Sequence, residues 1–133
     1  MGNSESNIKK VNFDDIITSK NTHIIINVME KHEQEILIKG TLSINEEIET
    51  INSLLALGKM DTTIIIYGKN TDDISKVISR YRQLQNMGFT NPRAYIGGLF
   101  EWLLLQEMYG CDEFKTNTTC KNSILDYKPD RGI

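Results

Sequence analysis

The chain is poor in the residues that metal centres and disulfide frameworks use. Its 133 residues include only two cysteines and two histidines. Cys111 and Cys120 have no C-x-x-C spacing, and neither His23 nor His32 stands at ligand spacing from a cysteine or a carboxylate. The sequence therefore predicts no metal and no cofactor. It also predicts that both cysteines are free thiols in a reducing compartment, rather than a disulfide or a catalytic pair.

Positive charge and long apolar runs are also scarce. Lys and Arg total 15 against 18 Asp and Glu, for a formal net charge of -3, so the surface has no basic field to attract nucleic acid. No apolar run reaches the roughly 20 residues that span a bilayer, and the polar start from Met1 to Lys10 does not resemble a secretory signal. We therefore expect a cytoplasmic chain that does not bind nucleic acid.

The length suits one compact domain with short extensions. Residues 1–10 are polar and small, which predicts a flexible N-terminal arm. Residues 111–133 are polar and lack a periodic pattern, which predicts a C-terminal tail. Only Ile124, Leu125 and Tyr127 are suited to anchor that tail on the body or to form a short docking segment. The domain itself is predicted over residues 11–110.

Apolar runs alternate with helical periodicities between residues 11 and 110. Runs rich in β-branched residues, typical of parallel sheets, stand at 23–28 and 62–67, and a helix capped by Asn45 ends at Gly58. This alternation predicts a parallel, doubly wound sheet with helices on both faces. The expected strands are 11–13, 23–28, 36–38, 41–44, 62–67 and 93–96, and the expected helices are 14–18, 46–57, 74–87 and 99–109.

Short motifs in a particular order resemble the rhodanese-like domain, a sulfurtransferase fold also seen in cell-cycle dual-specificity phosphatases. Residues 25–30 resemble L-I-D-V-R-E, residues 38–44 resemble I-P-G-A-x-N-I, and residues 64–67 resemble V-V-x-Y. Residues 88–91 are similar to G-F-x-N and residues 95–102 to L-x-G-G-x-x-x-W. The resemblance covers roughly residues 8 to 110. It implies a three-layer α/β/α fold with a central, mainly parallel five-stranded sheet.

The chain departs from the family at the positions that carry the chemistry. The resemblance implies a persulfide-carrying cysteine directly after the strand tyrosine and an anion-holding arginine some five residues later, where this chain has Gly68 and Asp73. Glycine supplies no thiolate for the covalent step. Asp73, beside Asp72, puts negative charge where the anion would sit. Asn27 and Met29 also stand where the family usually has Asp and Arg.

These departures predict that the chain is not an enzyme and has no catalytic residue. They leave a vestigial active-site loop made of Gly68, Lys69, Asn70, Thr71, Asp72 and Asp73. The loop is either a retained binding surface or an ordinary connection in which Asn70 or Thr71 caps the following helix. The apolar helix around Trp102 is either a partner-binding stripe or part of the core, and its apolar character on nearly every side favours the core.

The N-terminus fits an acylation pattern. Met1-Gly2-Asn3-Ser4-Glu5-Ser6 matches M-G-x-x-x-[ST], which predicts N-myristoylation on Gly2. A single myristoyl chain gives only marginal, reversible attachment, and Lys9 and Lys10 would add some attraction to an anionic leaflet. The pattern therefore predicts peripheral membrane association in a eukaryotic cell or in a virus that infects one.

Three functions remain open from the sequence. The leading hypothesis is a catalytically inactive rhodanese-like domain that acts as a protein-interaction or regulatory module, with an unknown protein as its partner. The first alternative is an active sulfurtransferase of the thiosulfate type that uses a displaced cysteine, Cys111 or Cys120. The second alternative is a viral structural protein.

Overall fold

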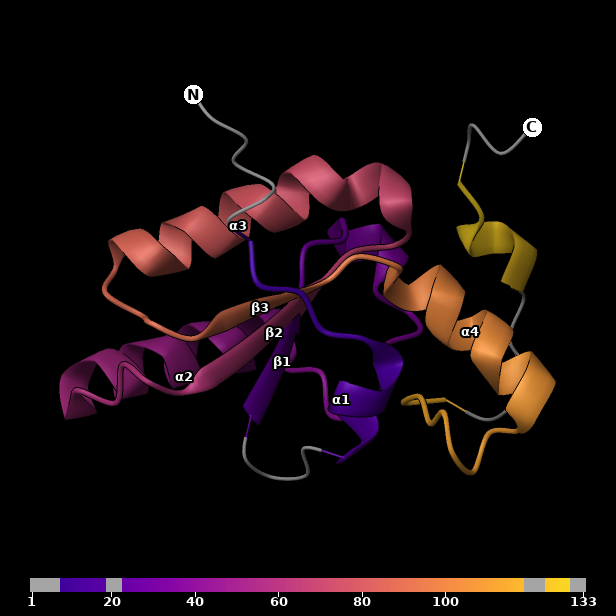
Figure 1. Cartoon of the computed structure of the whole chain (residues 1–133), viewed down its shortest axis with the longest axis horizontal. Coiled ribbons are helices and arrows are strands. Elements are labelled where there is room, and N and C mark those ends of the chain that lie inside the picture. Colours follow the sequence, from indigo (N-terminus) through magenta and orange to yellow (C-terminus); the bar gives the residue numbers. More distant parts are fainter. Residues whose placement is uncertain (1–7, 19–22, 119–123, 130–133) are drawn as a thin grey trace.

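A parallel sheet of three strands lies at the centre of the computed structural model, which describes residues 8–18, 23–118 and 124–129. The strand order is β1-β2-β3, with Ile25 opposite Ile65 and Ile65 opposite Arg93 (Figure 1). The elements in chain order are α1 (Phe13–Thr18), β1 (His23–Asn27), η2 (Lys31–Glu33), α2 (Ile44–Leu57), β2 (Thr63–Tyr67), η3 (Thr71–Asp73), α3 (Ile74–Asn86), β3 (Pro92–Tyr95), α4 (Gly98–Tyr109) and η4 (Ile124–Tyr127).

The expectation of five strands is wrong for the described part of the chain. Only isolated bridges form in or beside the segments predicted as further strands: Lys10, just before the predicted strand 11–13, with Ala94, Thr41 with Ile25, and Ile38 with Thr116. The first segment ends where Phe13 starts α1, and the segment that contains Thr41 ends where Ile44 starts α2, whereas Ile38 pairs with Thr116 outside the sheet. The sheet therefore has three strands, with one bridged segment along each outer edge.

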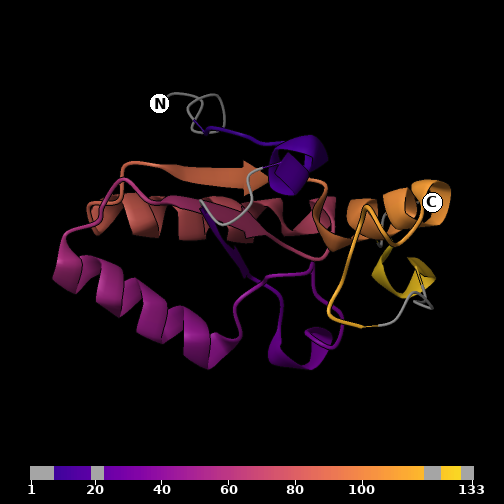
Figure 2. The same ribbon diagram turned by 90° about the horizontal axis from the view of Figure 1, so that it is seen from below.

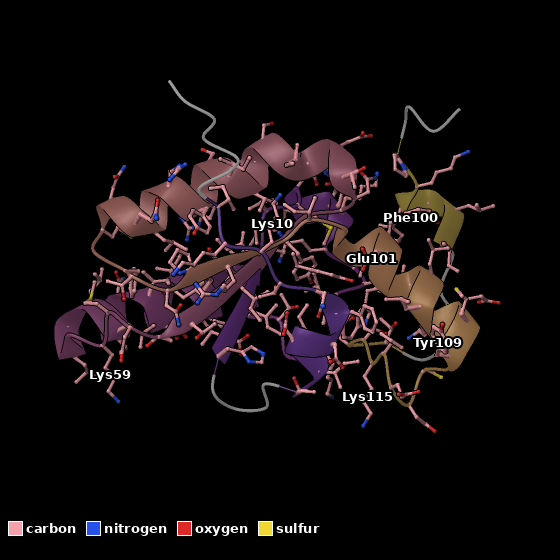
Figure 3. All side chains as sticks on the ribbon, viewed as in Figure 1. Lys10, Lys59, Phe100, Glu101, Tyr109 and Lys115 are labelled. Carbon is pink, nitrogen blue, oxygen red and sulfur yellow. The ribbon has the colours of Figure 1, made fainter. Side chains whose placement is uncertain are left out.

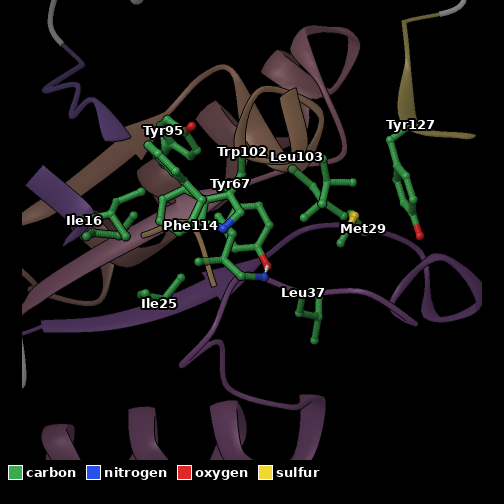
Figure 4. Packing of buried hydrophobic residues seen from close by; sticks show 13 residues of the cluster. Ile16, Ile25, Met29, Leu37, Tyr67, Tyr95, Trp102, Leu103, Phe114 and Tyr127 are labelled. Carbon is green, nitrogen blue, oxygen red and sulfur yellow. Dashed lines mark hydrogen bonds between the residues drawn. The ribbon is translucent and has the colours of Figure 1, made fainter. Parts of the chain in front are cut away.

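Helices cover both faces of the sheet. Its strands carry apolar residues in succession, and since alternate residues point to opposite faces, each face is apolar and must be buried. Ile25, Ile65, Tyr67 and Tyr95 contribute to one apolar cluster, which includes residues of α1 and α4 (Figure 4). Their neighbours Ile26, Ile64, Ile66 and Ala94 contribute to a second cluster, which includes residues of α2 and α3. Figure 2 shows α1 and α2 on opposite sides of the strands.

The helix predicted after Asn45 begins earlier than expected. Ser43 is its N-cap: the Ser43 hydroxyl accepts from the Glu46 amide at 3.2 Å, and the Glu46 carboxylate accepts from the Ser43 amide at 2.9 Å. This reciprocal pair is a capping box, which a serine three residues before a glutamate favours. Gly58 ends the helix with a left-handed φ of 71°, as predicted.

The segment after α4 folds back onto that helix. The indole of Trp102 donates to the Lys115 carbonyl at 2.9 Å, and Phe114 is buried in the cluster shared by α1 and α4. Cys111 in this segment is disulfide-bonded, so its prediction as a free thiol is wrong, while Cys120 lies outside the described residues. The prediction failed because the spacing of the cysteines does not show how the chain turns back after α4 and packs against Trp102.

Candidate functional site

The loop at residues 68–73 follows the carboxyl end of β2, the middle strand. In open parallel sheets this end is where ligands bind, so the loop is the candidate site. Its backbone begins inside the protein, because Gly68 and Asn70 are buried, and emerges at Thr71 and Asp72, which are exposed. All six residues of the predicted loop lie together at the carboxyl end of the middle strand.

Asn70 holds the loop in shape from within. Its Oδ1 accepts from the Asp72 amide at 2.8 Å, and its Nδ2 donates to the Tyr127 carbonyl at 2.8 Å. The side chain is only 4% exposed, so both halves of the amide are satisfied inside the protein. Of the two predicted caps, Asn70 and Thr71, Asn70 is the N-cap of η3, from which α3 continues directly.

The carboxylate of Asp73 fills the space beside Gly68. Its Oδ2 accepts from the Lys69 amide at 2.8 Å. A Cβ atom built on Gly68 would lie 2.5 Å from Asp73 Cβ and 2.9 Å from Asp73 Oδ2, closer than Cβ atoms approach in real structures. A backbone amide in such a loop is the type of donor that binds anions, and here it is already bonded to an anion of the chain itself.

The first residues of α4 press against the same loop. The Leu99 amide donates to the Gly68 carbonyl at 3.0 Å, and the Phe100 amide donates to the Lys69 carbonyl at 2.9 Å. Gly98 has a φ of +69°, and a Cβ on it would lie 2.5 Å from the Gly68 carbonyl oxygen. Only glycine allows both this backbone conformation and this approach, so α4 is clamped to the loop.

Carboxylates from η2 and the residue before it neutralise the lysines around the loop. Lys69 Nζ lies 3.5 Å from Glu33 Oε2, and Lys76 Nζ lies 3.3 Å from Glu30 Oε2 and 4.0 Å from Asp73 Oδ1. Burial acts to raise the pKa of the Glu33 carboxyl, but the Glu30 amide and the Lys69 ammonium outweigh it and hold that pKa below its usual value. Sequence reasoning missed Glu33 because no local pattern links it to a loop 36 residues later.

Asn27 and Met29, the unusual residues at the end of β1 and just after it, have structural roles here. Asn27 Oδ1 accepts from the Met29 amide at 2.9 Å, and Met29 is 5% exposed within the cluster shared by α1 and α4. A buried thioether presents no charge to a ligand. Neither residue extends the loop's capacity to bind an anion.

A hollow lined by described residues lies away from the loop. It has a volume of about 520 Å³, and its lining includes His23 at the start of β1, Ile17 of α1, and Trp102. It therefore lies near the amino end of β1, whereas the loop follows the carboxyl end of β2. Within residues 8–18, 23–118 and 124–129, no group of His, Cys, Asp and Glu is arranged to hold a metal ion. No helix in those ranges is both long and apolar enough to cross a membrane.

Comparison with known proteins relates this arrangement to a family. The profile of the rhodanese-like domain matches residues 11–105. A crystal structure of the Alr3790 protein from Anabaena sp. is 15% identical, with a TM-score of 0.55 over 71% of this chain and 86% of that chain. The solution NMR structure of the rhodanese-like domain of Alr3790 is 16% identical, with a TM-score of 0.55 over 86% of this chain and 88% of that chain.

A further similarity is to a longer protein. The crystal structure of reduced CoADR-RHD from Bacillus anthracis is 20% identical, with a TM-score of 0.52 over 71% of this chain and 16% of that chain. No curated protein matched the chain. At these identities the solved structures show a shared fold, and the family follows from the profile match over residues 11–105, which is more than half of the chain. This chain belongs to the family of rhodanese-like domains.

Proposed function

We propose that this rhodanese-like domain is catalytically inactive and acts by binding a protein partner at the rim of the loop at residues 68–73. The observation that carries the proposal is the Asp73 carboxylate, which accepts from the Lys69 amide at 2.8 Å beside a glycine. Sulfur transfer in this fold needs a thiolate and room for an anion at that place. Gly68 provides no thiolate, and the Asp73 carboxylate occupies the space that an anion would need.

The position of Cys111 argues against a displaced nucleophile. The loop contacts the first turn of α4, and Cys111 follows the last turn. A helix of 12 residues is about 18 Å long. In Figure 3, Phe100 lies at the end of α4 beside η4, and Tyr109 lies at the opposite end. A disulfide-bonded sulfur at that distance is neither a thiolate nor within reach of the loop.

The test is transfer of sulfur from thiosulfate to cyanide, with wild type, Cys111→Ser and Cys120→Ser compared. We expect the rate with each protein to equal the rate without protein. Wild-type activity that disappears in either serine variant would establish the displaced-cysteine enzyme and overturn the proposal. A sulfurtransferase with a cysteine in its loop serves as the positive control for the assay.

Gly68→Cys probes the loop directly. We expect this variant to remain inactive, because the new Cβ overlaps the Asp73 side chain and the carboxylate repels an anionic donor. Gly68→Cys combined with Asp73→Ala removes both obstacles and should exceed the single variant in the same assay. Efficient turnover by Gly68→Cys alone would show that Asp73 does not block the site.

We also propose that Gly2 is myristoylated and that the chain associates reversibly with membranes. The support is the M-G-x-x-x-S pattern at residues 1–6, which lie outside the described part of the structure. Intact mass of the protein from eukaryotic cells should show loss of Met1 and gain of one myristoyl group. Gly2→Ala is the control that should lack the added mass, and an unmodified wild-type terminus would remove the membrane proposal.

A further inference from the structure

The C-terminal turn η4 is seated against the candidate site. Tyr127, its last residue, is 8% exposed and belongs to the same apolar cluster as Met29 and Leu103. Figure 4 shows the Tyr127 ring on the side of Met29 and Leu103. Ile124, three residues earlier, packs against that cluster, whereas Leu125 between them is 73% exposed. One face of a single turn is therefore buried and the other faces solvent.

A polar contact fixes this turn at one position on the loop. The Nδ2 of Asn70 donates to the Tyr127 carbonyl at 2.8 Å, although the two residues are 57 positions apart. The bond is buried, so leaving either group without its partner would be costly. The loop thus provides a specific donor for the backbone of a docked turn, next to an apolar surface for its side chains.

The Tyr127 ring is buried in an apolar cluster, with the charge of carboxylates nearby. Burial, and then the nearby charges of Glu35, Asp126 and Glu33, raise the pKa of the Tyr127 phenol above its ordinary value. A neutral aromatic ring with a hydroxyl group suits this setting, and an acidic residue in its place would be repelled. Because the Tyr127 ring is buried against apolar side chains, this position favours a neutral aromatic residue over an anionic one.

We propose that the surface formed by Asn70, Met29 and Leu103 is a docking groove for one helical turn with an apolar residue and, three positions later, a tyrosine. In the resting chain, Ile124 and Tyr127 of η4 occupy this groove as an intramolecular ligand. A partner carrying the same turn binds by replacing η4. This inference rests on the proposed function and specifies the partner of the same site.

The seated turn is held weakly enough to be replaced. Its described anchors are one buried ring, one partly buried isoleucine and one hydrogen bond accepted by the Tyr127 carbonyl. Segments with so few contacts open without unfolding of the whole protein. A tethered segment still competes strongly, because its effective concentration is on the order of 1 mM. The groove is therefore closed to weak ligands until η4 is displaced or altered.

The test uses the full chain and a fluorescent peptide with the sequence of residues 122–129, N-S-I-L-D-Y-K-P. Tyr127→Ala weakens the intramolecular ligand and leaves the groove unchanged, so we expect the peptide to bind this variant at least about tenfold more tightly than wild type. Leu125→Ala is the matched control: it alters the exposed face of the same turn and should bind the peptide as wild type does.

A second variant tests the groove rather than its occupant. Asn70→Asp keeps the oxygen that accepts from the Asp72 amide but removes the donor to the docked carbonyl. Added to Tyr127→Ala, it should weaken peptide binding at least about tenfold. A peptide with alanine in place of its tyrosine should bind none of the proteins. The groove is disproved if the peptide fails to bind Tyr127→Ala, or binds wild type or the double variant equally well.

Amide hydrogen exchange tests the opening of η4 in the wild type, so this measurement does not depend on the folding of a variant. Residues 124–127 should exchange faster than β2 by at least about 100-fold, because η4 opens locally. Exchange of η4 at the rate of β2 would contradict a replaceable turn. The sulfur-transfer assay is independent of these results: enzymatic activity would refute the proposed function alone, and loss of peptide binding would refute the groove alone.

Discussion

Replacement of Gly98 by alanine tests the contact that clamps α4 onto the loop. The left-handed φ of +69° costs an alanine about 1 kcal/mol. Its Cβ would also lie 2.5 Å from the Gly68 carbonyl oxygen, so α4 must move away from the loop. That movement breaks the hydrogen bonds donated by the Leu99 and Phe100 amides, worth about 1 kcal/mol each. We expect a total loss of about 3 kcal/mol in the free energy of unfolding.

Gly58→Ala is the matched control. Gly58 has nearly the same φ, +71°, but a Cβ atom added to it would meet nothing within 4 Å. Its cost should therefore be the conformational one alone, about 1 kcal/mol. Urea unfolding measures both variants against wild type, and an unchanged slope with urea concentration shows that the unfolded state is comparable. Equal losses for Gly98→Ala and Gly58→Ala would refute the close approach of α4 to the loop.

Further predictions concern the core, a helix cap and the tail. Ile66→Ala removes a side chain with 0% exposure from β2 and should lower the free energy of unfolding by about 3 to 4 kcal/mol in urea. Ser43→Ala removes the cap of α2 and should cost about 1 kcal/mol, whereas Ser79→Ala on the exposed side of α3 should cost nothing measurable. Because the pKa of Tyr127 is raised in the folded protein, its contribution to stability is complete below about pH 10 and is lost at higher pH. Above that pH, the free energy of unfolding in urea should therefore fall more steeply for wild type than for Tyr127→Phe. Parallel pH profiles of the two proteins would contradict this.

The sequence was sufficient for the elements whose pattern is local. Runs of isoleucine predicted β1 and β2 to within a residue, since β-branched residues favour strands buried on both faces. Helical spacing predicted α3 and α4 in the same way. The sheet was overestimated, because short apolar segments beside Lys10 and Thr41 form single bridges rather than ladders. A strand of that length depends on its neighbours rather than on its own residues.

In the candidate loop, too, some features follow from the local sequence and others depend on distant contacts. Its residues, its place after β2 and the capping role of Asn70 followed from the sequence, because each depends on neighbours within a few positions. The burial of Tyr127 accords with the prediction of a tail anchor, while Leu125, predicted beside it, is exposed. The disulfide of Cys111 was not foreseen, since it depends on how the chain turns after α4.

Local patterns in the sequence were enough to specify a parallel α/β fold with a glycine and an aspartate in the loop after the strand predicted at residues 62–67. What surrounds these two residues depends on the tertiary structure. The Asp73 carboxylate lies beside Gly68, the backbone of α4 packs against the loop from a distant part of the chain, and Tyr127 bonds to Asn70 of the same loop. The physical reason is that hydrogen bonds between distant residues depend on how helices pack on the sheet, which no local pattern specifies.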